Sequence, residues 1–234
     1  MRLIINPTGI SSVNKIIKRI YDEKMYDKLF KEYNLNEYRK RLFNFHNLDD
    51  LLEKLYKKYV ESDITLKKLS SESNSLYEMK KANIIYPEKD NLIFLHTDTY
   101  EGELSTKFLV KVLESAKEFN FKKIITVMMP GVKAGNANSF VEGLKYLCEN
   151  FETGIKIDSF DEIVFNFTGG YKGVVPVITI LNRIIKKIYN KECVLCYLYE
   201  GSSEIIKYVI DGMDIDTYIK GKKIQINNGS FFRC

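Results

Sequence analysis

Short apolar runs alternate along the chain with segments whose apolar residues recur at helical spacing. The runs predict strands at residues 3–5, 91–95, 123–129, 163–165 and 193–199, the last of them ending the core sheet. The helical spacing covers residues 13–20, 104–116, 136–151 and 174–188. Strands that alternate with helices predict an α/β fold, with a Rossmann-like, mostly parallel sheet flanked by helices on both faces.

Three segments extend this alternation. Residues 21–62 are charged and amphipathic, and Leu48, Leu51 and Leu55 mark one helical face, so we expect a helical insertion there. Ser70-Ser71-Glu72 opens a further short helix. We therefore expect one domain over residues 1–210, followed by a short tail over residues 211–234 that forms a β-hairpin.

The stretch from Val164 to Pro176 predicts an anion site. A buried strand ends at Thr168-Gly169-Gly170, and a helix follows from about Val174. The first N–H groups of a helix lack partners, glycine lets a ligand approach the backbone, and Lys172 adds a positive charge. Phosphate suits such a site, although the same spacing also fits a plain turn.

Other polar turns follow the predicted strands. They are Thr8 to Ser12, His96 to Thr99, and Glu200. In parallel sheets the ligand lies beyond the carboxyl ends of the strands, so these turns together favour a phosphate-containing ligand. Ser11 or Ser12 also suits a helix N-cap, Asp98 suits a cap or a structural acceptor, and His96 suits packing behind its strand better than acid–base work.

Nucleotide motifs and metal-ligand clusters are missing from the sequence. Neither GxxxxGK[ST] nor GxGxxG occurs, which argues against a nucleoside triphosphatase or a dinucleotide enzyme. Cys193 and Cys196 form a CxxC inside a predicted strand, where their side chains point to opposite faces, and no second pair accompanies them. We expect buried thiols in a reducing compartment, no metal and no cofactor.

Length and charge add modest limits. The 234 residues are 45% hydrophobic, enough for a sizeable core, and the net charge of +5 suits an anionic ligand or simply Lys-rich solvated faces. No signal peptide or apolar run long enough to cross a membrane is visible, so we expect a cytoplasmic protein.

The pattern N-x-T-G-G-[YF]-K-x-x-x-P, from Asn166 to Pro176, resembles the CARF domain (CRISPR-associated Rossmann fold). Gly9-Ile10-Ser11 resembles the first turn of this family, with Ile10 where the family often has Thr. Leu95 to Thr99 with Gly102, and Tyr197 to Glu200, resemble two of its strand ends. The resemblance runs from residue 3 to about residue 210.

The resemblance implies a homodimer whose paired turns build one symmetric pocket for cyclic oligoadenylate, the second messenger of type III CRISPR systems. Arg41 and His46 have the RxxxxH spacing, but neither His46 nor His96 lies in a terminal helix like the one that carries this motif in a HEPN ribonuclease. We see no winged-helix tail either, so no DNA is expected. A free-standing protein of this kind resembles a ring nuclease. A non-catalytic sensor that controls a partner, and a small-molecule α/β enzyme that uses the same turn, remain alternatives.

A ring nuclease needs no metal in principle, because the ribose 2′-hydroxyl can attack the adjacent phosphodiester and leave a 2′,3′-cyclic phosphate. Positioning and charge stabilisation then carry most of the catalysis. The resemblance implies Lys172 and Ser11 as catalytic residues, with Lys172 aided by the N–H groups of Gly169 and Gly170. The expected ligand-binding residues are Thr8, Gly9, Ser12, Thr97, Asp98, Asn166, Thr168, Gly169, Gly170, Tyr171 and Glu200. Tyr171 could stack on adenine or pack against the sheet.

Overall fold

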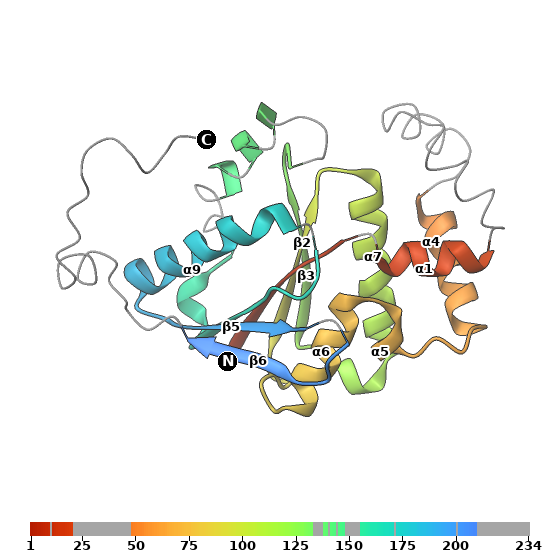
Figure 1. Cartoon of the computed structure of the whole chain (residues 1–234), viewed down its shortest axis with the longest axis horizontal. Helices are drawn as coiled ribbons and strands as arrows, with labels where there is room; N and C mark the ends of the chain where they lie inside the picture. Colours follow the sequence, from red (N-terminus) through yellow and green to blue (C-terminus); the bar gives the residue numbers. More distant parts are fainter. Residues whose placement is uncertain are drawn as a thin grey trace.

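A mostly parallel sheet crosses the protein in the order β3-β2-β1-β4-β5-β6 (Figure 1). The coordinates are a computed structural model that describes residues 1–9, 11–20, 48–132, 138–139, 141–143, 145–147, 155–170, 172–199 and 201–209. The strands are β1 (Arg2–Pro7), β2 (Asn91–Thr97), β3 (Lys123–Met129), β4 (Glu162–Asn166), β5 (Glu192–Leu198) and β6 (Ile205–Val209). Strands β1 to β5 are parallel, and β6 is antiparallel to β5. The predicted α/β, Rossmann-like fold is confirmed.

Helices cover both faces of the sheet (Figure 1). One face carries α1 (Ser11–Ile20), α4 (Leu48–Val60), α5 (Leu66–Leu69), α6 (Ser71–Lys81) and α7 (Tyr100–Ser115). The other carries α9 (Val175–Tyr189) and the segment around the 3₁₀ helix η2 (Ile157–Ser159). Two further 3₁₀ helices are η1 (Lys117–Phe119) and η3 (Lys172–Val174). This two-sided cover is the reason that the middle of each central strand is a continuous apolar run, such as Leu3–Ile5 in β1 and Leu92–Leu95 in β2.

Successive residues of each central strand enter different cores. Ile4 packs with the α1 to α7 layer, whereas Leu3 and Ile5 pack with the α9 layer, and all three are fully buried. Cys193 and Cys196 divide in the same way, as predicted. Burial raises the pKa of the Cys193 thiol to about 11 and that of Cys196 to about 12, so both are neutral, buried thiols.

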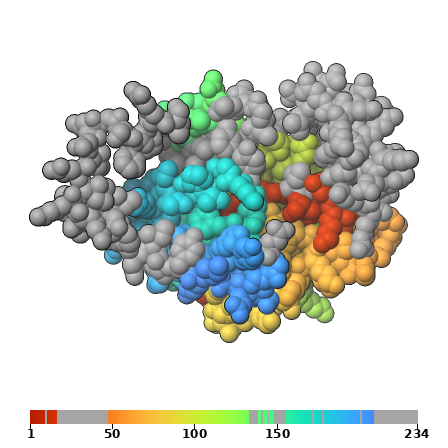
Figure 2. Space-filling view, in the orientation of Figure 1, coloured from red at the N-terminus to blue at the C-terminus, as the bar shows by residue number. Residues whose placement is uncertain are grey.

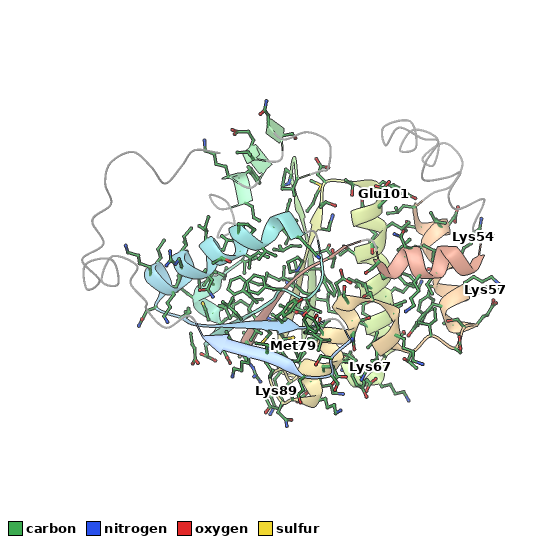
Figure 3. All side chains as sticks on the ribbon, viewed as in Figure 1. Lys54, Lys57, Lys67, Met79, Lys89 and Glu101 are labelled. Carbon is green, nitrogen blue, oxygen red and sulfur yellow. The ribbon has the colours of Figure 1, made fainter. Side chains whose placement is uncertain are left out.

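The helices are amphipathic in the sense that the sequence predicts. Met79 of α6 points into the core and is fully buried, while Lys54 and Lys57 of α4 project outward at the edge of the molecule (Figure 3). Within the described ranges, no helix combines the length and the apolar character that a membrane span requires.

Two predicted boundaries are wrong. The strand at 193–199 does not end the sheet, because β6 follows it and forms the edge. The helix predicted to bury Ile188 begins at Val175 after η3 and leaves Ile188 64% exposed, since its last turn runs past the core.

Other predicted elements fall partly outside the described residues. Of the insertion at 21–62, α4 and residues 61–62 are described, while residues 21–47 lie outside. The described residues between 138 and 147 are helical, as predicted, but the rest of the 136–151 helix lies outside. The tail at 211–234 lies outside as well, so the hairpin stays a prediction.

Candidate functional site

The order of the sheet reverses between β1 and β4. From β1 the chain moves outward to β2 and β3, and then returns to β4 on the other side of β1. In open α/β sheets the crevice for a ligand forms at the carboxyl ends of the two strands at this switch point. The turns after β1 and β4 both lie there. Their surfaces meet in the space-filling view, where α1 is red and the β4–α9 region is cyan (Figure 2).

The two turns touch backbone to backbone through glycines. Gly170 has φ of +86°, a conformation that side chains disfavour. A Cβ at this position would lie 2.5 Å from Cβ of Pro7 and 2.8 Å from its carbonyl carbon. A Cβ on Gly9 would lie 3.5 Å from Cα of Gly170. The close approach of the two turns therefore depends on the absence of side chains.

A carboxylate that we did not predict holds these turns together. Glu72 of α6 is only 1% exposed. Its Oε1 accepts hydrogen bonds from the N–H groups of Gly9 at 2.8 Å and Gly170 at 2.9 Å. Its Oε2 accepts from the hydroxyls of Ser11 and Ser71, both at 3.1 Å. The anion held by the glycine turns is thus the protein's own carboxylate, and the Gly170 N–H that we assigned to phosphate is already engaged.

The local sequence of α6 explains why Glu72 stands here. Ser70 caps the helix in a capping box with Ser73, as the Ser-rich opening predicts, and places Glu72 in the first turn, where the helix dipole favours a negative charge. One turn on, Ser75 accepts from Nδ2 of Asn166 at 2.6 Å. Asn166 also donates to Asn6 on β1, so α6 is pinned to the ends of both central strands.

Thr8 and Ser12 face helix α7 rather than solvent. The Thr8 hydroxyl lies 2.6 Å from that of Thr106, and the Ser12 hydroxyl 2.7 Å from that of Ser105. Both residues are buried, so the ligand contacts predicted for them require these hydrogen bonds to break.

The N-cap role suggested for Ser11 or Ser12 is wrong. Helix α1 already begins at Ser11, and the two hydroxyls bond to Glu72 and Ser105 instead. Ser11 itself is exposed, so its hydroxyl stands between the buried carboxylate and the surface.

The turn after β2 is held by internal bonds. Asp98 accepts from the N–H of Gly131 at 3.2 Å, which agrees with the structural role suggested for it. Thr99 caps α7, and the Thr97 hydroxyl lies 2.9 Å from that of Thr99. His96 is 6% exposed, with Nδ1 3.0 Å from the Thr97 carbonyl oxygen. Burial lowers the pKa of the His96 imidazole, which agrees with packing rather than acid–base work.

The turn after β4 ties the site to β5 and leads to the predicted cation. The Thr168 hydroxyl accepts from the N–H of Leu198 at 2.8 Å. A Cβ on Gly169 would lie 2.4 Å from Cγ of Glu72, so this glycine also makes room for the carboxylate. Lys172 opens η3 with an exposed side chain. Tyr171 and Glu200 lie outside the described residues.

The chain matches a known protein family. A family model described as CRISPR-associated protein (Cas_APE2256) matches residues 67–208, more than half of the chain. The chain belongs to this family. The match covers Glu72 and the turn from Asn166 to Lys172, whereas the turn after β1 precedes it. No curated protein matches this Cas_APE2256 chain.

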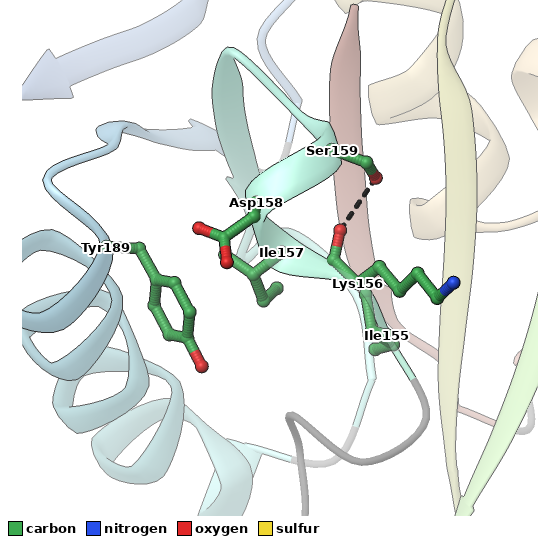
Figure 4. Close-up of a pocket in the computed structure, with 6 residues that line it drawn as sticks. All are labelled: Ile155, Lys156, Ile157, Asp158, Ser159 and Tyr189. Atoms are coloured by element: carbon green, nitrogen blue, oxygen red, sulfur yellow. Dashed lines mark hydrogen bonds between the residues drawn. The ribbon is translucent and has the colours of Figure 1, made fainter.

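Four residues of this Cas_APE2256 protein come into direct contact at the switch point, namely Gly9, Ser11, Glu72 and Gly170. Sequence reasoning named three of them and missed Glu72. A signal for it exists, because Glu72 shares a helical face with Leu76 and Met79 at spacings of four and seven. An open hollow lined by Ile155–Ser159 and Tyr189 lies before the amino end of β4, and so away from this site (Figure 4).

Proposed function

We propose that this protein binds cyclic oligoadenylate and cleaves it as a ring nuclease, which switches off type III CRISPR signalling. Its membership of a CRISPR-associated family and the resemblance of its turns to CARF domains support this function. The observation that carries it is the meeting of two turns at the switch point, one bearing Ser11 and the other leading to Lys172. Cyclic tetra-adenylate is the ring that we expect.

The proposed reaction uses the adenylate's own nucleophile. The ribose 2′-oxygen bonds to phosphorus as the bond from phosphorus to the 5′-oxygen breaks. The 2′-hydroxyl loses one proton and the 5′-oxygen gains one, so the products are a 2′,3′-cyclic phosphate and a 5′-hydroxyl. Catalysis then consists of holding the 2′-oxygen in line and stabilising the charge that grows on the phosphoryl oxygens.

Two exposed side chains suit these tasks. Lys172 offers an ammonium group close after the glycine turn, and we assign it to the phosphoryl oxygens. Ser11 offers a hydroxyl fixed by Glu72, and we assign it to the ribose. A cyclic ligand with two-fold symmetry fits an isologous dimer, so we expect two copies of these turns around one ring.

The engagement of Gly170 favours a second candidate function. Its N–H donates to Glu72 and so is not available to a phosphate unless that bond breaks. A site with fewer donors for the transition state suits a non-catalytic sensor that binds cyclic oligoadenylate and controls a partner effector.

Incubation of the purified protein with cyclic tetra-adenylate in EDTA, followed by chromatography of the products, separates the two functions. Linear products that end in a 2′,3′-cyclic phosphate support the ring nuclease. An unchanged ring with tight binding supports the sensor. A protein that neither binds nor cleaves cyclic oligoadenylates of any ring size would contradict both and leave a small-molecule α/β enzyme.

A further inference from the structure

The buried carboxylate of Glu72 has no task in the proposed reaction, yet it contacts both turns of the site. It lies on α6, outside the turns that follow the strands, and it is 1% exposed. A buried charge is costly unless it is fully hydrogen-bonded, and four donors surround these two oxygens. Such an arrangement holds the carboxylate in one orientation.

The polarity of the bond to Ser11 follows from this arrangement. An ionised carboxylate accepts hydrogen bonds and cannot donate them, so Ser11 must be the donor in the 3.1 Å contact with Oε2. The hydrogen of the Ser11 hydroxyl is therefore committed to Glu72. Because Ser11 is exposed, its oxygen lone pairs remain available on the side away from the carboxylate.

On the basis of the proposed function, we propose that Glu72 is a positioning residue that makes Ser11 a hydrogen-bond acceptor for the ribose 2′-hydroxyl. The nucleophile of the ring is a donor, and an acceptor at a fixed place holds its oxygen in line with the scissile bond. The carboxylate acts through Ser11 and does not itself touch the ligand.

The charges around the site also favour a ribose hydroxyl, rather than a phosphate, beside Ser11. A phosphate beside Ser11 would lie near the Glu72 carboxylate, and like charges at short range repel. A ribose hydroxyl carries no net charge and does not meet this repulsion. The phosphate then lies on the side of Lys172. In this arrangement Ser11 binds the ribose hydroxyl of a nucleotide and Lys172 binds its phosphate.

Glu72→Gln tests the polarity while it keeps the shape. The two glycine N–H groups can only donate, so the amide oxygen of Gln faces them and its NH₂ group faces Ser11. The Ser11 hydroxyl then accepts from the amide and turns its hydrogen toward the ligand. We expect a folded dimer that binds cyclic tetra-adenylate within a few-fold of wild type but cleaves it about 100-fold more slowly.

A control variant lies on the same helix. Glu78→Gln changes a second buried carboxylate, which pairs with Lys67 and belongs to no turn of the site. It should cleave at close to the wild-type rate, which separates the role of Glu72 from a general effect of altering α6.

A double-mutant cycle with Ser11→Ala gives the decisive readout. If Glu72 acts through Ser11, then Glu72→Gln slows single-turnover cleavage strongly in the wild type and hardly at all in Ser11→Ala. Effects that multiply would overturn the proposal, as would wild-type cleavage by a folded Glu72→Gln protein. If the wild type binds the ring without cleaving it, the ring nuclease fails and the same cycle is measured on the dissociation constant. Coupling between Glu72 and Ser11 in the dissociation constant then supports the Glu72 proposal, and the absence of coupling overturns it. A wild type that does not bind the ring overturns both the Glu72 proposal and the proposed function.

Discussion

The backbone N–H of Gly170 donates to Oε1 of Glu72 at 2.9 Å, although the two residues lie 98 positions apart. The same oxygen accepts from Gly9, so one buried atom joins the turn after β1 to the turn after β4. The hydrogen bonds of the parallel sheet stop at the ends of the strands, so they do not fix the positions of the turns that follow. The carboxylate fixes them relative to each other, and the geometry of any ligand site between them depends on it.

Replacement of Gly170 should expose how tightly the turns are packed. Gly170→Ala combines a left-handed backbone, which costs a non-glycine residue about 1–2 kcal/mol, with a Cβ pressed against the Pro7 backbone. Gly201→Ala is the matched control, because Gly201 has φ of +83° and nothing lies within 4 Å of its added Cβ. Urea unfolding should show that Gly170→Ala loses at least about 1 kcal/mol more than Gly201→Ala. Equal losses would mean that the turns separate easily.

Most of the fold could be predicted because burial on both faces leaves a strong mark. Strands such as Leu92 to Leu95 are fully buried and read as apolar runs, and the turns between them are polar. The strand β6 was missed because it lies at the edge of the sheet. Half-exposed residues such as Ile206, 51% exposed, and a lysine within the strand do not give the pattern of a buried strand.

The site was predicted only where it follows the strands. Gly9, Ser11 and Gly170 stand at carboxyl ends of strands, where topology gathers them. Glu72 comes from a helix that packs over those ends through the Ser75 to Asn166 bond, and no motif reports that packing. The Ser-Ser-Glu sequence predicts the start of a helix, which is correct, but it gives no sign that the carboxylate also binds the two glycine turns.

The buried histidine predicts a pH dependence of stability. Burial lowers the pKa of His96 below its ordinary value of about 6.5. As pH falls below about 6.5, the unfolded chain binds a proton that the folded chain binds less readily, so the free energy of unfolding decreases. The free energy of unfolding, measured with denaturant, should therefore fall less between pH 7.5 and 5.5 in His96→Gln than in the wild type.

Nuclear magnetic resonance offers a direct check on the same group. The chain has two histidines, His46 and His96, and a His46→Gln variant assigns the signals. The His96 signal should titrate with a midpoint below 6.5 in the folded protein. A midpoint above 6.5 would contradict the depressed pKa and would reopen acid–base work by His96.

The proposed dimer can be tested on α9. Ile180 is 49% exposed on this helix, which follows the glycine turn and which we expect at the two-fold interface. In an isologous interface one substitution acts on both subunits. Ile180→Glu should therefore raise the dimer dissociation constant, measured by analytical ultracentrifugation, by about tenfold or more. Ile206→Glu, on the edge strand β6, is the control with similar exposure, 51%. A monomeric wild type at micromolar concentration would contradict the dimer itself.

Lys172 gives the sharpest test of the proposed chemistry. A lysine shortly before helix α9 opposes the helix dipole, so its removal should leave stability unchanged or raise it by a few tenths of a kcal/mol to about 1 kcal/mol. If its ammonium group faces the scissile phosphate, it stabilises charge that grows in the transition state. Lys172→Ala should then cleave cyclic tetra-adenylate about 100-fold or more slowly. Binding should weaken less, because the bound ring carries several phosphates and many other contacts.

The control for this variant is Lys187→Ala, which removes a cation from the other end of the same helix. A lysine near the carboxyl end of a helix interacts favourably with the helix dipole, so Lys187→Ala should lower the stability of the protein slightly. Cleavage should stay at the wild-type rate. Lys172→Ala should therefore slow cleavage without lowering the melting temperature, whereas Lys187→Ala should lower the melting temperature without slowing cleavage. A general loss of positive charge would not produce this difference. Wild-type turnover by a folded Lys172→Ala dimer would remove Lys172 from the reaction. It would leave the phosphoryl charge to donors other than Gly170, whose N–H is held by Glu72.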